Sequence, residues 1–140
     1  MILIITHKED FTADFVINKL NEREIAYYRF NCEDIDKENY LFSNQNHFSF
    51  QLNNLNSFHS VWFRRTKLPQ LNIKNEAEKL YLLSEYDSLL NNLFLQLKTK
   101  KWLSNPTNVY QAENKIFQLH IAQEIGFVIP DTIITNQHSV

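Results

Sequence analysis

Apolar positions in the first 30 residues change from strand spacing to helical spacing and back. Residues 2–5 form a continuous run of β-branched and leucine side chains, which is typical of a strand buried on both faces in a parallel sheet. Asp10 is placed to cap a following helix, and residues 25–30 predict a second strand. The expected apolar positions of that helix are Phe11, Phe15, Val16 and Leu20. The pattern predicts a βαβ unit.

A polar stretch, residues 31–60, carries one half-exposed strand pattern. Within it, residues 47–52 alternate aromatic or leucine side chains with polar ones. A turn at residues 53–56, with apolar Leu55 and Phe58 around its end, is compatible with a small hairpin beside the main sheet. We therefore expect a peripheral hairpin here.

A third buried strand and a long helix follow. Residues 61–63 are apolar and lead directly into Arg64 and Arg65. Residues 75–101 carry leucines at three- and four-residue steps, which predicts the longest helix of the chain. We interpret the basic residues near its end as a solvated terminus that complements the helix dipole; they are Lys98, Lys100 and Lys101.

The last 35 residues predict one more helix and an extended segment. Asn108 and Gln111 have the spacing of a capping box, and Gly126 is placed to end the helix that they begin. Residues 132–135 then predict a strand with no later strand to pair with. This ending suggests a fragment of a longer protein.

Taken together, the pattern predicts an α/β fold with a small, mostly parallel sheet flanked by helices and a possible peripheral hairpin. The 140 residues are 44% hydrophobic and 21% charged, as expected for a soluble globular protein. The only glycine, Gly126, excludes a glycine-rich phosphate loop. A net charge of -2 and the lack of a long apolar window predict no nucleic-acid or membrane partner. The lone Cys32 favours the cytoplasm.

Candidate chemistry lies where two predicted strands end. The loop from His7 to Asp10 follows the first strand, and Arg64 and Arg65 follow the third. In a parallel sheet both places lie at the carboxyl edge, where such sheets bind ligands. Guanidinium groups suit a carboxylate or a phosphate, and neighbours along a strand point to opposite faces. We expect at least one of the two arginines to bind a ligand, and which one stays open.

Other chemistry finds little support in the residues. The five histidines have no metal-ligand spacing, so no metal site is expected. Glu9 and Asp10 resemble the acidic pair of response-regulator receivers, but Arg64 stands where such a domain needs an aspartate. No complete catalytic set is expected in this chain.

Residues 102–136 read WLSNPTNVYQAENKIFQLHIAQEIGFVIPDTIITN and resemble the entry into an ATP-grasp domain. The resemblance is carried by Asn114 and Lys115 together with the spacing of the Gln, Ala, Gly and Pro residues that follow. With ILIITHKEDFTAD at the start and VWFRR in the middle, the chain resembles the amino-terminal region of ATP-grasp peptide maturases that make graspetides, the microviridin-type and grasp-with-spasm enzymes.

The resemblance implies a pre-ATP-grasp domain in residues 1–105, and the entry helix and first strand of a truncated ATP-grasp domain in residues 106–140. It implies a ligase that uses ATP and Mg²⁺ to phosphorylate a side-chain carboxylate of a ribosomally made precursor peptide. A hydroxyl or amine of the same peptide then attacks the acyl phosphate, giving a macrocyclic ester or amide. We also expect a homodimer.

In relatives, the lysine that matches Lys115 reaches the nucleotide phosphates, although a surface lysine without that role stays possible here. The rest of a nucleotide site would lie after Val140, so this chain alone is expected to be inactive and to bind no cofactor. Two alternatives remain. One is a binding or dimerisation module that uses the rings of Phe48 and Phe50, and the other is an ATP-grasp ligase acting on a small carboxylic acid.

Overall fold

The computed structural model describes residues 1–45 and 47–137. The chain forms two compact units, Met1–Pro106 and Thr107–Val140, called here the first and the second unit. The last three residues of the predicted second domain, 138–140, lie outside the described residues. Within the described residues, no helix is both long enough and apolar enough to cross a membrane.

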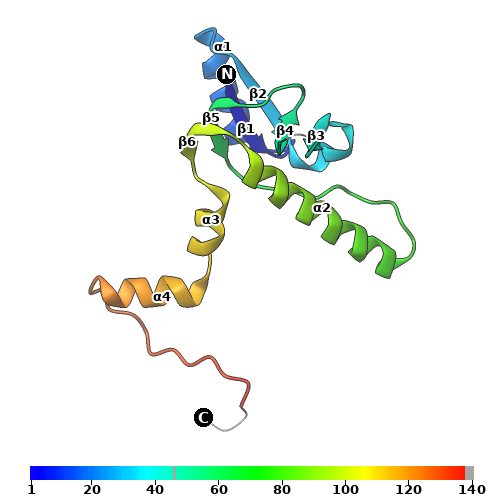
Figure 1. The fold of residues 1–140 in the computed structure, drawn as a ribbon. Coiled ribbons are helices and arrows are strands. Elements are labelled where there is room, and N and C mark those ends of the chain that lie inside the picture. Colours follow the sequence, from blue (N-terminus) through cyan, green and yellow to red (C-terminus); the bar gives the residue numbers. More distant parts are fainter. Residues whose placement is uncertain (46, 138–140) are drawn as a thin grey trace. The chain divides into compact units, whose positions relative to one another are not determined.

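A four-stranded parallel sheet forms the centre of the first unit (Figure 1). Its strands stand in the order β2-β1-β5-β6, and every neighbouring pair is parallel. The bounds are Ile2–Thr6 for β1, Tyr27–Asn31 for β2, Phe58–Phe63 for β5 and Thr99–Leu103 for β6. The predicted α/β fold class is confirmed.

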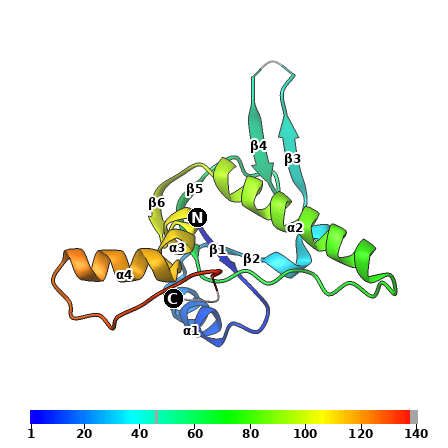
Figure 2. The same cartoon turned by 90° about the horizontal axis from the view of Figure 1, so that it is seen from below.

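Two helices cover the two faces of this sheet (Figure 2). Helix α1, Phe11–Glu22, connects β1 to β2, and α2, Glu76–Gln96, connects β5 to β6. These two connections run in opposite directions along the sheet. Since crossovers between parallel strands are right-handed almost without exception, two connections in opposite directions place their helices on opposite faces.

The α2 face carries the hydrophobic core of the first unit. The Phe63 ring meets Phe94 of α2 edge to face, with ring centroids 5.5 Å apart. Further buried side chains around this contact are Leu3, Ile5, Phe30, Val61, Leu90 and Leu93. Burial of this apolar area is the main force that holds α2 on the sheet.

Helix α1 begins at the predicted cap, but its two phenylalanine rings lie on the exposed face of the helix. The Asp10 side chain accepts hydrogen bonds from the amides of Thr12 and Ala13, which confirms the predicted cap. Ala13 is buried, whereas Phe11 and Phe15 are 82% and 64% exposed. The apolar positions keep the predicted helical spacing, but the turns that place Ala13 on the sheet place these two rings on the far side of the helix.

The predicted hairpin exists, but its second strand lies earlier in the chain. Strand β4, Ser49–Leu52, pairs antiparallel with β3, Tyr40–Ser43, as a separate two-stranded sheet. The Phe42 and Phe50 rings pack across the pair with centroids 4.8 Å apart. The predicted turn forms at Asn53 and Asn54, whose φ angles of 48° and 63° are left-handed. It leads to β5, and a short 3-10 helix, Cys32–Lys37, precedes the hairpin.

The prediction that three lysines end the long helix is wrong. Helix α2 is capped by Asn75 and stops at Gln96. Lys100 and Lys101 belong to β6, and Lys98 lies before it. Pairing with β5, where Val61 is opposite Trp102, overrides the helical pattern because strand hydrogen bonds and the sheet surface become available only in the folded chain.

Two short helices replace the single helix predicted after Asn108. Helix α3 is Pro106–Ala112, so Asn108 lies inside it, and α4 is Lys115–Glu124. Asn114 caps α4 by accepting from the amides of the residues two and three positions later. Gly126, with φ +85°, ends α4 as predicted. Residues 127–137 contain no strand in the part of the chain described, and a strand there would need a partner strand.

Candidate functional site at the carboxyl edge of the sheet

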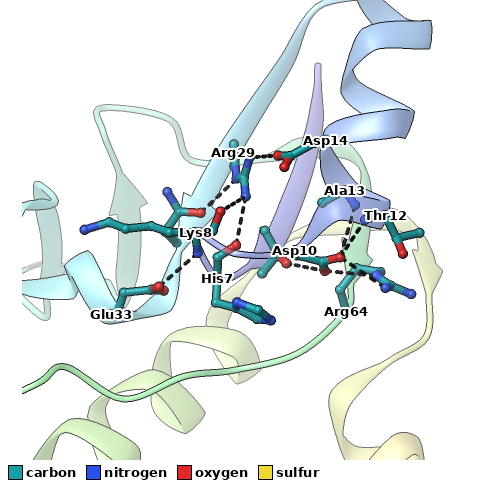
Figure 3. Close-up of polar contacts among 11 residues, drawn as sticks. His7, Lys8, Asp10, Thr12, Ala13, Asp14, Arg29, Glu33 and Arg64 are labelled. Carbon is teal, nitrogen blue, oxygen red and sulfur yellow. Dashed lines mark hydrogen bonds and ion pairs between the residues drawn. The ribbon is translucent and has the colours of Figure 1, made fainter.

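The loop after β1 and the end of β5 meet at the carboxyl edge of the sheet (Figure 3). From β1 the chain passes to β2 on one side, whereas β5 lies on the other, so the strand order changes direction between β1 and β5. Open α/β sheets bind ligands at such a switch point. The structure therefore brings the predicted loop and Arg64 to the position where the fold favours a ligand.

Asp10 is the most heavily bonded side chain at this edge. One carboxylate oxygen, Oδ1, accepts from the amides of Thr12 and Ala13, both at 3.1 Å. The other, Oδ2, accepts from the Thr6 hydroxyl at 2.6 Å. Arg64 donates to both oxygens, from Nε at 3.1 Å and from Nη2 at 3.2 Å. Every one of these donors favours the ionised carboxylate.

The charge state of Asp10 follows from this environment. Burial raises the pKa of the Asp10 carboxyl, but the hydrogen bonds from Arg64, Thr6 and the Ala13 amide lower it by more. The pKa therefore lies well below the ordinary value for an aspartate. Asp10 is an anion that ties the start of α1 to the end of β5.

Arg64 is held on two sides. Its guanidinium lies over the ring of Trp62, with its central carbon 5.3 Å from the ring centroid, which is the range of a cation–π contact. Its side chain keeps 26% of its surface exposed. Strand alternation explains the arrangement, because residues 62 and 64 point to the face that α1 covers and residue 63 points to α2.

The other predicted arginine is placed differently. Arg65 is exposed, and no hydrogen bond or ion pair of its side chain is found among residues 1–45 and 47–137. The structure thus brings Arg64 together with Asp10 and leaves Arg65 outside this group. The sequence pattern predicted opposite faces for the two residues, but not which of them would meet the loop.

Arg29 is a residue of this edge that sequence analysis missed. Its Nη2 donates to the carbonyl oxygens of His7 at 2.8 Å and Lys8 at 3.1 Å, and its Nη1 pairs with Asp14 of α1. These bonds fix the backbone of the loop that carries Asp10. A charged side chain inside an apolar strand is rare unless it is paired, and that signal was present at position 29.

His7 lies in the same loop, as predicted. Its carbonyl oxygen also accepts the amide of Asp10 at 3.3 Å, which closes the turn. Its ring nitrogen Nδ1 is buried and has no hydrogen-bond partner among the described residues. The backbone of His7 therefore shapes the loop.

A cavity of about 360 Å³ lies at the carboxyl edge beside the loop. Its lysines are already paired: Lys8 and Lys37 both bond Asp34, at 2.7 and 2.6 Å, and Lys67 bonds Glu9 at 2.7 Å. The hydrogen bond from Lys67 lowers the pKa of the Glu9 carboxyl. Exposed pairs of this kind contribute little stability, and no lysine of the cavity is left for an anion.

The described residues do not fit ATP and Mg²⁺. No group of three or more His, Cys, Asp or Glu residues that could hold a metal ion is found in them. Lys115, the predicted phosphate contact, is exposed on α4, and its Nζ bonds the Gln118 side chain at 3.2 Å. One exposed lysine is not a nucleotide site, so no step through ATP is derived from these residues.

Comparison with known proteins identifies the family. The model of the MvdD pre-ATP grasp domain matches residues 1–110. The chain therefore belongs to this family, which confirms the resemblance to the amino-terminal region of ATP-grasp peptide maturases. No curated protein matches the chain in a sequence search.

Solved structures similar to this one include ATP-grasp ligases. The macrocyclase MdnB from Microcystis aeruginosa MRC is 26% identical with a TM-score of 0.74, over 96% of this chain and 47% of that one. A Chryseobacterium gregarium RiPP-associated ATP-grasp ligase, in complex with ADP and a leader and core peptide, is 26% identical with a TM-score of 0.76, over 97% and 44%.

The macrocyclase MdnC of the same Microcystis, bound with precursor peptide MdnA, shares the fold at 20% identity and a TM-score of 0.80, over 98% of this chain and 48% of that one. The present chain thus spans about half the length of the similar structures.

Proposed function

We propose that this chain is the amino-terminal part of an ATP-dependent ligase that closes macrocyclic esters or amides in a ribosomally made precursor peptide. The observation that carries the proposal is the family match over residues 1–110. Two similar structures support it: MdnB is a macrocyclase, and the Chryseobacterium ligase holds ADP with a leader and core peptide. The proposed substrate is therefore a peptide that carries acidic side chains.

In the proposed reaction the full-length protein activates a side-chain carboxylate as an acyl phosphate, and a hydroxyl or amine of the peptide displaces the phosphate. We assign residues 1–105 to the pre-ATP-grasp domain and residues 106–140 to the entry of the ATP-grasp domain. ATP and Mg²⁺ supply the activation in that protein. Lys115 is our proposed contact to the nucleotide phosphates, and the 140-residue chain alone is proposed to be inactive.

Of the two predicted arginines, we propose Arg64 as the contact to the substrate carboxylate. It stands at the switch point of the sheet, and Trp62 shields one side of its guanidinium. A fixed guanidinium steers a carboxylate by two parallel hydrogen bonds. The loop from His7 to Asp10 forms the neighbouring wall of the proposed site.

The competing idea of a binding module built on Phe48 and Phe50 finds less support. Phe50 is only 5% exposed and packs on Phe42, whereas Phe48 is 54% exposed. Of the two rings proposed for this module, only Phe48 is therefore available to a partner. The other alternative, a small carboxylic acid as substrate, would use the same Arg64 contact and the same activation step, and it differs in the carboxylate that is activated.

The test is a reaction of the full-length protein with ATP, Mg²⁺ and a candidate precursor peptide, followed by mass spectrometry. The expected result is the loss of one water from the peptide for each ring closed, together with ADP formation. ADP formation with a small carboxylic acid but with no acidic peptide would favour the alternative substrate. A full-length protein that forms no ADP with either would refute the proposal.

Arg64→Ala is expected to lower the rate of cyclisation at low peptide concentration by roughly 10-fold to 100-fold, since a charged hydrogen-bond pair is lost. Arg23→Ala is a suitable control, because it removes the same charge from the exposed end of α1. Unchanged cyclisation in both Arg64→Ala and Arg65→Ala would remove the arginine contact from the proposal.

A further inference from the structure

The Asp10 side chain makes two kinds of contact. It caps α1, and both of its carboxylate oxygens also accept hydrogen bonds from the side chain of Arg64. The Asp10 side chain is only 4% exposed, so a ligand does not reach it directly. Any effect of Asp10 on a ligand must therefore act through Arg64.

We propose that Asp10 is a positioning residue, which holds the guanidinium of Arg64 so that its outer edge receives a carboxylate of the substrate. This inference rests on the proposed function for the identity of the substrate. It goes further in assigning the orientation of Arg64 to a second residue and in naming the edge that binds.

The hydrogen bonds to Asp10 define which edge of the Arg64 guanidinium remains available to a ligand. A guanidinium has five N–H donors in a fixed planar fork. Nε and one N–H of Nη2 are used by Asp10. The edge formed by Nη1 and the second N–H of Nη2 has no acceptor among the described residues, and 26% of the side chain is exposed. Two parallel donors at one edge match the two oxygens of a carboxylate.

Two further contacts keep this edge in place. The Trp62 ring, 5.3 Å from the guanidinium carbon, limits rotation of the guanidinium plane. Thr6 donates to the same Asp10 oxygen that Nε bonds, at 2.6 Å, and so fixes the carboxylate itself. Fixing a long side chain before binding removes most of the entropy that an exposed arginine would lose on binding.

The pairing with Asp10 does not cancel the attraction for an anion. The Asp10 charge is shared among the two α1 amides, the Thr6 hydroxyl and Arg64. The amino-terminal end of α1 adds its own partial positive charge beside the pair. The outer edge of Arg64 therefore still presents a positive potential together with a fixed hydrogen-bond geometry.

The test compares variants that separate the capping of α1 by Asp10 from the hydrogen bonds between Asp10 and Arg64. Asp10→Asn and Asp10→Ser both retain an oxygen that can cap α1, but neither offers Arg64 two anionic oxygens. Arg64→Lys keeps the charge and loses the fork. Arg23→Ala is the control for the loss of one exposed charge near α1. Circular dichroism of each variant verifies that the protein is folded.

The first readout is binding of N-acetylglutamate N-methylamide to the full-length protein by calorimetry, which needs no turnover. The expected result is a dissociation constant raised by about tenfold in both Asp10 variants and in Arg64→Lys. Arg23→Ala is expected to leave it within about twofold. Affinity unchanged in both Asp10 variants would overturn the inference. If these variants do not fold, unchanged affinity in Arg64→Lys would overturn it.

The second readout is steady-state kinetics with peptide and with ATP. A positioning role predicts a raised KM for the peptide and an unchanged KM for ATP in Asp10→Asn, whereas general loss of structure would change both. A wild-type protein that binds the glutamate probe but closes no ring would refute the proposed function and leave the site standing. Ring closure with unaltered peptide KM in the Asp10 variants would refute the inference alone.

Discussion

The two units of this chain form their helices by the same local signals, yet they differ in what covers their apolar side chains. In the first unit, α1 and α2 each lie on a face of the sheet, and the core side chains are fully or almost fully buried. In the second unit, none of residues 107–137 is buried. Ile116, Ile125 and Phe127 are each more than 60% exposed.

The difference separates two contributions, the local capping of a helix and the burial of its side chains in a core, which act together in a single compact domain. A cap and a stop residue are sufficient to set where a helix begins and ends, as Asn114 and Gly126 do for α4. They do not create a core. Cooperative stability comes from the long-range contacts of the first unit, where strands far apart in the sequence are neighbours.

The largest expected effect is a core truncation in the first unit. Phe94→Ala removes a ring that is 4% exposed and packs on Phe63, which should lower the free energy of unfolding by about 3 to 5 kcal/mol. Ile116→Ala in α4 is the matched change in the second unit and should cost less than about 0.5 kcal/mol. Urea unfolding followed by circular dichroism, which reports the helices of both units, measures both changes. Equal losses would show that the second unit has a core of its own.

A smaller effect is expected from removing a helix cap in each unit. Asp10→Ala removes the cap of α1 and leaves Arg64 without its partner, so the free energy of unfolding should fall by about 3 kcal/mol. Asn114→Ala removes only a cap and should reduce the helix content of α4 with a cost of about 1 kcal/mol or less. Urea unfolding and circular dichroism test the pair. A cost at Asp10 no larger than at Asn114 would show that the Arg64 pair adds no stability.

The Asp10 pair also predicts how the stability of the first unit depends on pH. The folded-state pKa of Asp10 is lowered, so its contribution is fully present above the unfolded pKa, near about 3.9, and is lost as the pH falls below that value. Between about pH 5 and pH 2 the wild type should lose about 2 kcal/mol more than Asp10→Asn. Urea midpoints across this range provide the measurement. Parallel curves for the two proteins would contradict the assigned role of the charge.

The smallest expected effect lies at the end of α4. Gly126 has φ +85°, a left-handed conformation that strains a side chain even though nothing lies within 4 Å of an added Cβ. Gly126→Ala should therefore cost about 1 kcal/mol locally and fray the last turn of α4. Hydrogen exchange of the Phe127 amide, which bonds the Ala122 carbonyl, reports this change. Unaltered exchange would mean that another contact ends the helix.

Much of the fold was predictable from short-range patterns. The apolar run of β1, the cap at Asp10 and the stop at Gly126 each depend on neighbours within a few residues, and all three are confirmed. The candidate site was predictable in outline, because the carboxyl edge follows from parallel strands and helical crossovers. The predictions failed where a segment fitted two patterns. Residues 98–101 fit the pattern of a helix end as well as that of a strand, and residues 99–101 belong to β6.

The sequence by itself determined β1, α1, β2 and β5 of the first unit, and that a loop and an arginine pair would reach one edge. Only the tertiary structure decided that Arg64 is the arginine that pairs with Asp10, that Arg29 holds the loop, and that β4 pairs with β3. The physical reason is the separation along the sequence over which each kind of interaction acts. Capping and periodicity act over a single helical turn, whereas these contacts join residues up to 54 positions apart and exist only after the chain has closed around the sheet.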